Sequence, residues 1–219
     1  TVSANTTSGF SIVKFTANGS NNGTIGHGLG STPAIVIYKR LDGTGPWYVL
    51  YTFVDGSQDY LILDSTSAKA DLASSTYGTA TSSTISNIGF TNTHSILAYC
   101  FAEKQGFSKF GSYTGNGNAD GTFVYTGFKP AMIIMKRSDA SGNNWRIFDN
   151  KRSTSGFNVT DKALRPNTSD AEITSNIDFL SNGVKIRNTD GETNTSGATY
   201  IYMAFAEEPL VGDNPATAR

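Results

Sequence analysis

The amino-acid sequence predicts an all-β fold built from antiparallel sheets. Three observations lead to this prediction. Short apolar runs rich in β-branched and aromatic residues recur along the chain, turns rich in Gly and Asn separate them, and helix signals are few. The 219 residues suffice for one large β domain or two smaller ones. We therefore expect a β-sandwich of jelly-roll or concanavalin-like type, either one in each half of the chain or one shared by both halves.

Phrases that occur twice indicate two internal repeats. Gly9-Phe10-Ser11 returns as Gly106-Phe107-Ser108, and Pro33-Ala34-Ile35 returns as Pro130-Ala131-Met132 at the same spacing. Lys39-Arg40-x-Asp42 and Phe101-Ala102-Glu103 also return, as Lys136-Arg137-x-Asp139 and Phe205-Ala206-Glu207. The predicted organisation is an N-terminal segment over residues 1–8, a β repeat over 9–105, a second over 106–209, and a C-terminal tail over 210–219.

Each repeat contains matching strand signals. AIVIY after Pro33 and AMIIM after Pro130 are short and continuously apolar, which favours strands covered on both faces. Further strands are expected in WYVLYTF from Trp47, YLILD from Tyr60, SILAYCFA from Ser95, WRIFD from Trp145 and TYIYMAFA from Thr199. FLSNGVKIR from Phe179 predicts two strands joined by a tight hairpin turn. Helices of a turn or two are expected in TSAKADLASS from Thr66 and TSDAEIT from Thr168, where a Ser or Thr can cap the first turn.

The composition argues against several classes of partner. Charged residues make up 16% of the chain, the net charge is −1 and the pI is about 6.1. This balance offers no basic surface for a phosphate backbone or an anionic membrane, so we expect no nucleic acid partner. No run of 18 apolar residues occurs, and the first residues lack the pattern of a signal peptide. We expect no membrane insertion.

Metal and cofactor signals are weak. Cys100 lies in an apolar run and is predicted to be a buried core residue, because one cysteine with His27 and His94 cannot complete a four-ligand zinc site. Asn116, Asn118 and Asp120 have the spacing of a calcium loop, but Gly127 stands where a bidentate Glu is needed. We expect an ordinary Gly/Asn hairpin there, and neither a metal nor a cofactor.

Two kinds of polar constellation are candidate binding residues. The Lys-Arg-x-Asp phrase followed by Trp resembles a sugar or anion site, but it occurs in both repeats and is therefore more typical of the fold. Features that occur once are better candidates for recognition, because a building element is repeated whereas a binding site need not be. The candidate ligand or interface contacts are His27, Trp47, Tyr48, Asn143, Asn144 and Trp145.

An enzyme is not expected. Glycoside hydrolysis needs two carboxylates at a fixed separation, and the Asp residues are scattered through predicted turns. Neither histidine lies in a setting typical of a nucleophile's base, and no phosphate-binding GxxxxGK[ST] motif is present.

The sequence resembles a known family over nearly its whole length, from Gly9 to Pro209. GHGLGSTPAIVIYKR, and above all the joint AYCFAEKQGFSKFGSYTGNGNADG, are similar to the repeat found in large virion proteins of marine tailed bacteriophages that infect cyanobacteria and pelagic bacteria. The resemblance implies a non-enzymatic structural protein on the virion surface, in a tail fibre or similar appendage, with a role in host attachment. It supplies no catalytic residues.

Alternatives to a structural appendage module follow from the same sequence. The first is a lectin-like receptor-binding tip that recognises a host cell-surface glycan. The others are a capsid decoration protein and a polysaccharide depolymerase. The expected partners are further copies of the chain, with a trimer favoured because phage fibres are commonly trimeric, and other virion proteins.

Overall fold

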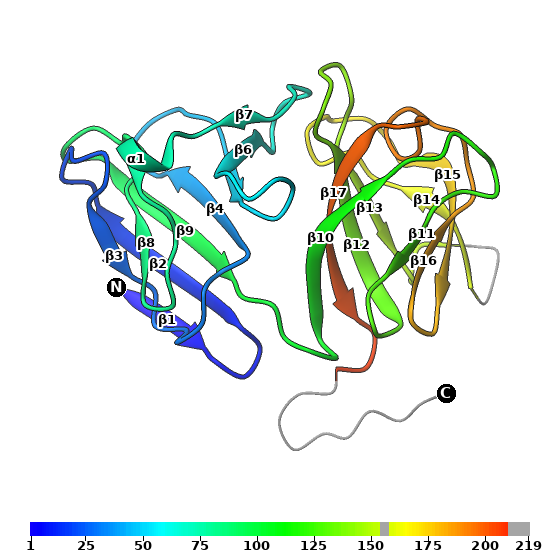
Figure 1. Ribbon diagram of the computed structural model, residues 1–219, viewed down its shortest axis with the longest axis horizontal. Helices are drawn as coiled ribbons and strands as arrows, with labels where there is room; N and C mark the ends of the chain where they lie inside the picture. Colours follow the sequence, from blue (N-terminus) through cyan, green and yellow to red (C-terminus); the bar gives the residue numbers. More distant parts are fainter. Residues whose placement is uncertain (154–157, 210–219) are drawn as a thin grey trace. The chain divides into compact units, whose positions relative to one another are not determined.

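The structure is a computed structural model that describes residues 1–153 and 158–209 (Figure 1). The described residues form antiparallel strands and one helix of four residues, so the predicted all-β class is confirmed. They divide into two compact units. Unit 1 comprises Thr1–Leu63 and Lys69–Glu103, and unit 2 comprises Asp64–Ala68 and the chain from Lys104 onward. The predicted tail over 210–219 lies outside the described residues.

Unit 1 is built on a seven-stranded sheet with the strand order β1-β2-β9-β4-β5-β6-β7. Its strands are β1 (Val2–Asn5), β2 (Phe10–Thr16), β4 (Ile35–Arg40), β5 (Tyr48–Tyr51), β6 (Asp59–Ile62), β7 (Ala70–Asp71) and β9 (Ser95–Phe101). A second, two-stranded sheet pairs β3 (Thr24–Gly26) with β8 (Thr84–Ser86), and the helix α1 spans Ser74–Tyr77. Residues 1–8, expected as a separate segment, contain β1, which pairs with β2 over Val2 to Asn5.

The core of unit 1 follows from alternation along its strands. Successive side chains of a strand point to opposite faces, and β9 alternates between partly buried and buried residues along its length. Its buried positions, Ile96, Ala98 and Cys100, join Tyr38 of β4 and Ile85 of β8 in one apolar cluster. Cys100 is a buried free thiol, as predicted.

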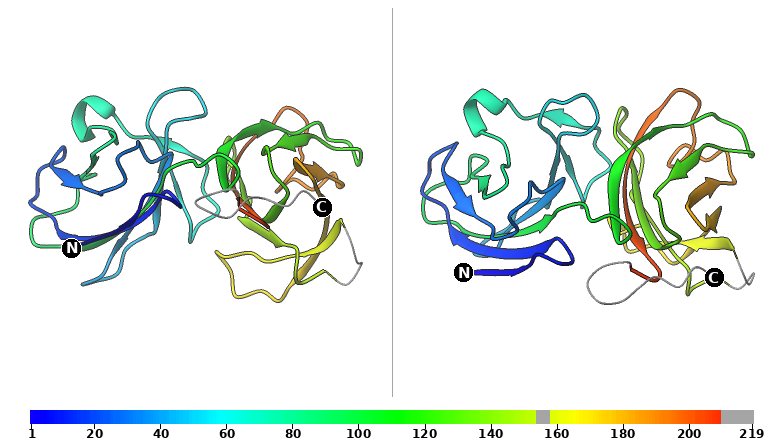
Figure 2. Two further views of the ribbon diagram at one scale, coloured as in Figure 1. Left: turned by 90° about the horizontal axis from the view of Figure 1, so that it is seen from below. Right: turned by 60° about the horizontal axis from the view of Figure 1, so that its bottom comes forward.

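Unit 2 is a sandwich of two four-stranded antiparallel sheets, visible as separate layers in Figure 2. One sheet has the order β10-β17-β12-β13, with β10 (Ser108–Thr114), β12 (Pro130–Arg137), β13 (Arg146–Asp149) and β17 (Thr199–Ala206). The other has the order β11-β16-β15-β14, with β11 (Phe123–Tyr125), β14 (Val159–Ala163), β15 (Ile173–Leu180) and β16 (Gly183–Ile186). Both sheets contribute to one core, which includes Ile133, Phe148, Phe179, Val184 and Tyr200.

The two units share a strand order. The run β2-β9-β4-β5 in unit 1 corresponds to β10-β17-β12-β13 in unit 2, and the pair β3-β8 corresponds to β11-β16. The register also agrees in the hairpin that follows each Pro-Ala phrase. Tyr38 lies opposite Tyr48 in β4-β5, and Met135 lies opposite Arg146 in β12-β13.

Local signals for helices were partly wrong. The only helix in the described residues is α1, at the end of the segment predicted from Thr66, while Ala70 within that segment pairs with Tyr60 as a strand. The segment from Thr168 contains no helix, and β15 begins at Ile173. In both places strand pairing outweighs a weak helix propensity. The tight hairpin between Leu180 and Gly183 is confirmed, and Gly183 lies so close to the carbonyl of Val124 that a side chain would not fit.

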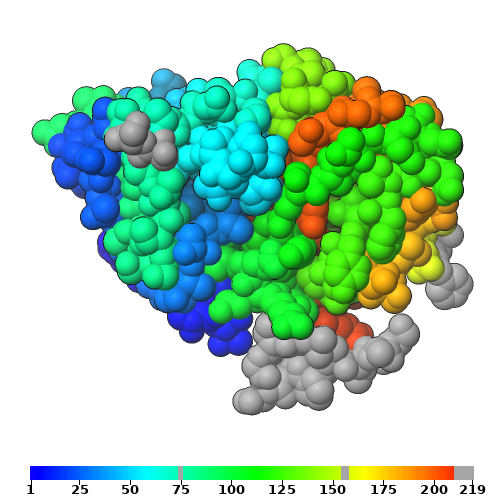
Figure 3. Space-filling model, viewed as in Figure 1, coloured from blue at the N-terminus to red at the C-terminus, as the bar shows by residue number. Residues whose placement is uncertain are grey.

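The loop 79–83, turquoise in Figure 3, lies on the surface of unit 1 and is rich in Thr and Ser. Among the residues that the structure describes, no helix is both long and apolar enough to cross a membrane.

Candidate functional site

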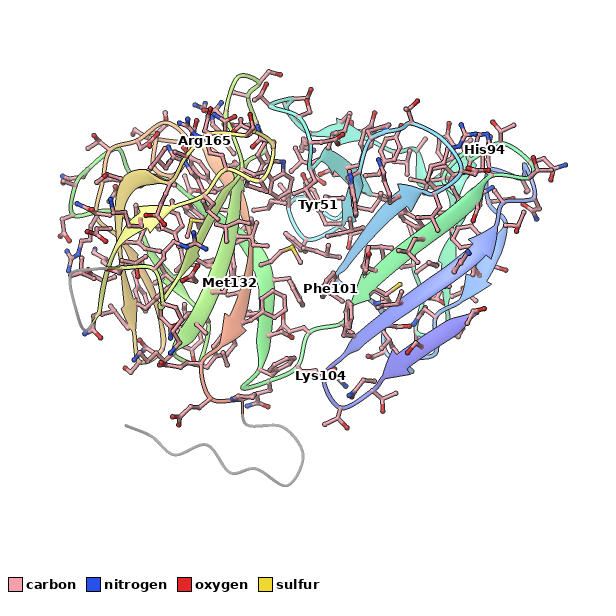
Figure 4. The ribbon with its side chains drawn as sticks, turned by 180° about the vertical axis from the view of Figure 1, so that it is seen from behind. Tyr51, His94, Phe101, Lys104, Met132 and Arg165 are labelled. Carbon is pink, nitrogen blue, oxygen red and sulfur yellow. The ribbon has the colours of Figure 1, made fainter. Side chains whose placement is uncertain are left out.

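A groove of about 150 Å³ in unit 1 is the candidate binding site. Three parts of the chain form it: the end of β4, the turn that leads into β5, and the connection 87–94 between β8 and β9. Figure 4 labels His94, the last residue of this connection. The groove is lined by Arg40, Gly45, Pro46, Tyr48, Gly89, Phe90, Thr91 and His94.

Aromatic rings form its apolar wall. Tyr48 and Phe90 meet edge to face, with ring centroids 6.1 Å apart, and Tyr48 meets Tyr60 in the same way at 5.6 Å. Phe90 also contacts Tyr38, whose hydroxyl donates a hydrogen bond to the carbonyl of Ser86. These contacts fix the ring orientations, and fixed rings are suited to stacking against the apolar face of a planar or saccharide ligand.

Arg40 forms the polar wall and is held in place by Asp42. Arg40 Nε donates to Asp42 Oδ1 at 2.8 Å, and the backbone N–H of Ser95 donates to Asp42 Oδ2 at 3.1 Å. The hydrogen bond from Arg40, more than any other interaction, lowers the pKa of Asp42 and keeps it ionised. The terminal nitrogens of Arg40 have no hydrogen-bond partner among the described residues, so they remain available to a ligand.

The same clasp occurs in unit 2. Arg137 Nε donates to Asp139 Oδ1 at 2.7 Å, and the backbone N–H of Thr199 donates to Asp139 Oδ2 at 3.2 Å. In both units this Arg-Asp-backbone clasp ties the end of one strand to the start of another. It is therefore an element of the fold, and in unit 1 its Arg40 also lines the groove.

The preceding lysines differ between the units. Lys39 Nζ donates to the carbonyl of Gly45 at 2.5 Å and lies 5.3 Å from the ring centroid of Trp47, so it fixes the turn beside the groove. Lys136 is fully buried and donates to the carbonyl of Arg137 at 2.7 Å. Burial lowers the pKa of Lys136 to about 8.

The connection 87–94 contains a residue with a strained backbone. Thr93, next to His94, has a φ of +75° and is the one non-glycine residue with positive φ in the described part of the chain. Its N–H donates to the carbonyl of Ala17, just as the N–H of Gly197 donates to the carbonyl of Gly115 in unit 2. Gly197 has the same φ of +75° at no steric cost. A β-branched residue with this backbone is strained, and such strain occurs most often at functional sites.

The corresponding place in unit 2 is filled by ion pairs. Arg146, at the register position of Tyr48, is only 2% exposed and pairs with Asp190 at 2.5 Å. It also pairs with Glu192, which Arg165 contacts at 3.1 Å. Asn144 Nδ2 donates to Glu192 Oε1 at 2.6 Å. At this register position unit 2 has a cluster of buried and half-buried charges where unit 1 has aromatic rings, and within it Arg146 Nη1 has no hydrogen-bond partner in the part of the chain that the structure describes.

Of the six residues proposed from the sequence, only Tyr48 lines the groove. His27 is fully buried, its ring accepting from the N–H of Leu29 and contacting the carbonyl of Thr81, and Trp145 is 1% exposed. Burial removes both from any ligand surface. Trp47 stacks on Tyr99 at 6.4 Å. Asn143 donates to the carbonyls of Ala140 and Ser141.

Sequence reasoning missed most of the groove. Arg40 was considered, but its repetition assigned it to the fold, and Phe90, Thr91 and His94 were not singled out as ligand contacts. One signal could have found them. Phe90 is a large aromatic in a Gly-, Asn- and Thr-rich connection, where the second repeat has no aromatic residue.

Carboxylates gather at a second place in unit 1, but a lysine fills their centre. Lys69 Nζ lies 2.9 Å from Asp55 and Asp59 and 3.3 Å from Asp71. Within residues 1–153 and 158–209, no group of three or more His, Cys, Asp or Glu side chains is placed to hold a metal ion. The Asn116-Asn118 loop is instead closed by Asn194, whose Nδ2 donates to Asn116 Oδ1 and to the carbonyl of Asn118.

Together, the fold and the groove define an antiparallel β protein of two units, with an aromatic-walled surface groove in unit 1. The chain belongs to the family described as a domain of unknown function, DUF7483, whose model matches residues 1–209. Comparisons with curated proteins and with solved structures found no match.

Proposed function

We propose that the protein is a non-enzymatic structural module on the surface of a tailed bacteriophage particle, in a tail fibre or similar appendage, and that it contributes to host attachment. The resemblance of its repeated phrases to those of phage virion proteins supports the location. The shared strand order and the shared clasp support the structural role, because they are typical of a building element used more than once.

The groove of unit 1 is the observation that supports attachment. It combines fixed aromatic rings with side chains whose hydrogen-bonding groups are not all used within the protein, and this is the usual composition of a carbohydrate site. Its 150 Å³ is below the roughly 300–1,000 Å³ of drug-sized ligand sites, so it fits about one sugar ring. We expect a dissociation constant of about 1 mM for a single groove. Useful attachment then depends on many copies acting together.

Immuno-electron microscopy of the particle tests the location. Antibodies raised against the 219-residue chain should label an appendage of the phage that encodes it. Label confined to the capsid shell would favour the decoration protein, and absence of label from intact particles would refute the proposal. Analytical ultracentrifugation at micromolar concentration tests the expected trimer, and a monomer would count against it.

Glycan binding is tested on the isolated chain by NMR. Titration with a panel of oligosaccharides should shift the backbone signals of Thr91, His94 and Arg40 and leave unit 2 unchanged. Tyr48→Ser should abolish these shifts. Tyr125→Ser is the control, because Tyr125 is 62% exposed and belongs to unit 2, whereas the groove belongs to unit 1. Equal effects of the two variants, or shifts outside the groove, would refute binding there.

Hydrolysis of the same oligosaccharides provides the test of the depolymerase alternative. Three carboxylates surround Lys69, and the ammonium engages each of them, so this group lacks the free acid and base that glycoside hydrolysis requires. We expect no cleavage products by mass spectrometry.

A further inference from the structure

The polar groups of the groove indicate what kind of sugar it selects. Among the side chains that line it, Arg40 can only donate, and the polar groups of His94, Thr91 and Tyr48 can donate or accept. None of the eight lining residues is a carboxylate or an amide, so no side chain there only accepts. A neutral sugar presents hydroxyls that both donate and accept, and its sites usually offer acceptors as well. A carboxylate, sulfate or phosphate group accepts only.

The carboxylate that holds Arg40 is already engaged. Asp42 accepts from Arg40 Nε at Oδ1 and from the N–H of Ser95 at Oδ2, and it does not line the groove. Arg40 keeps its two terminal nitrogens, the pair that can bind an anionic group in bidentate fashion. The guanidinium lies against Gly43, where a Cβ would come within 2.8 Å of Arg40 Cζ, so its position is restricted.

The charged side chains around the groove carry a net positive charge. Asp42 balances Arg40, while Lys39 adds a positive charge at Gly45 in the groove wall. The ring of His94, in the connection 87–94, has no hydrogen-bond partner among the described residues. A ligand in the groove therefore meets the donors Arg40 and His94, the aromatic rings of Tyr48 and Phe90, and a wall that carries the charge of Lys39.

We propose that the groove selects an acidic saccharide, in which one sugar ring lies against Tyr48 and Phe90 and its anionic substituent is bound by Arg40. This inference rests on the proposed glycan binding and adds the chemical class of the ligand. A uronic acid and a sulfated sugar share this chemistry, so the experiment includes both.

The test compares charged oligosaccharides with their neutral forms on the full chain. Isothermal titration or NMR would use hexagalacturonate against its fully methyl-esterified form, and a sulfated galactan hexasaccharide against its desulfated form. We expect each charged probe to bind at least about tenfold more tightly than its neutral form, and binding to weaken as salt rises. The arm with the larger ratio identifies the anionic group.

Two pairs of variants distinguish recognition from folding. Arg40→Gln should weaken the charged probes about tenfold, while Arg137→Gln, which removes the same clasp in unit 2, should not affect binding. Thr91→Glu places a negative charge at the groove and should repel the charged probes only. Ser82→Glu adds the same charge at an exposed position in the loop 79–83 and is its control. Thr91→Glu keeps the test valid if Arg40→Gln fails to fold.

The outcomes separate the two proposals. Equal binding of charged and neutral probes in the groove would refute the acidic saccharide and leave glycan binding standing. Binding of neither kind would refute both. The control variants Arg137→Gln and Ser82→Glu could reduce binding of the charged probes as much as Arg40→Gln and Thr91→Glu do. That result would show nonspecific attraction and would also overturn the inference.

Discussion

Replacing Lys136 with Met should stabilise unit 2, although it removes a charged residue and a hydrogen bond. Lys136 is fully buried, and burial lowers its pKa from 10.5 to about 8. At about 1.36 kcal/mol per pKa unit, keeping this ammonium charged in the folded state costs about 3 kcal/mol at pH 7. Met has a similar length and no charge. Loss of the hydrogen bond to Arg137 offsets about 1 kcal/mol, so we expect a net gain of about 2 kcal/mol.

Lys39→Met is the matched control and should have the opposite sign. Lys39 stands at the same place in the first Lys-Arg-x-Asp phrase, but its ammonium contacts the Trp47 ring and the carbonyl of Gly45. Losing these two contacts should destabilise unit 1 by about 1–2 kcal/mol. Because each unit has one tryptophan, urea unfolding followed by fluorescence in a Trp47→Phe background reports unit 2, and a Trp145→Phe background reports unit 1.

The pH dependence of the stability difference shows whether the buried charge of Lys136 is its cause. Between pH 8 and 10.5 the unfolded chain binds more protons than the folded chain at Lys136, so the stability of the wild type rises with pH in this window. The advantage of Lys136→Met should therefore fall from about 2 kcal/mol at pH 7 to nearly nothing at pH 10. A destabilised Lys136→Met protein, or a difference from the wild type that does not change with pH, would refute the reasoning.

Three further predictions concern single contacts. Thr93→Gly should relieve the strained backbone of the connection 87–94 and stabilise unit 1 by about 1 kcal/mol in urea unfolding, while Gly197→Thr should destabilise unit 2 by at least as much; a destabilised Thr93→Gly would contradict the assignment of strain. Tyr200→Phe should cost unit 2 about 2 kcal/mol, because the hydroxyl both donates to the carbonyl of Gly191 and accepts from the N–H of Thr195, each at 2.8 Å; a change below about 0.5 kcal/mol would show that water replaces both bonds. The thiol of Cys100, whose pKa burial raises to about 12, should react with a disulfide reagent at pH 8 only after urea unfolds unit 1, and rapid labelling of the native protein would contradict its burial.

The fold class could be predicted from the sequence because its signals are local. The apolar runs after Pro33 and Pro130 form β4 and β12, and the turn after Leu180 forms the hairpin between β15 and β16. The helix signals failed because a few helix formers cannot compete with strand pairing, as Ala70 shows by pairing with Tyr60.

The groove could not be predicted to the same extent. Its walls come from two connections far apart in the sequence, and nothing local places Phe90 beside Tyr48. The rule that repeated features belong to the fold was useful for the clasp, yet it removed Arg40 from consideration. The clasp uses only Nε of Arg40 and leaves its two terminal nitrogens without a partner among the described residues. In unit 2, Arg137 Nη1 donates to Thr195 Oγ1. Exposure was the other missing information, since His27 and Trp145 have side chains typical of binding sites and are buried.

The Arg-Asp-backbone clasp fixes the start of a strand independently of the connection that precedes that strand. It fixes where β9 and β17 begin, through the N–H groups of Ser95 and Thr199, whatever lies before them. The connection before β9 covers residues 87–94, and the connection before β17 is longer, covering 187–198. The strand order is nevertheless the same. The connection that precedes this strand can therefore differ in length and sequence while the order of the strands stays the same.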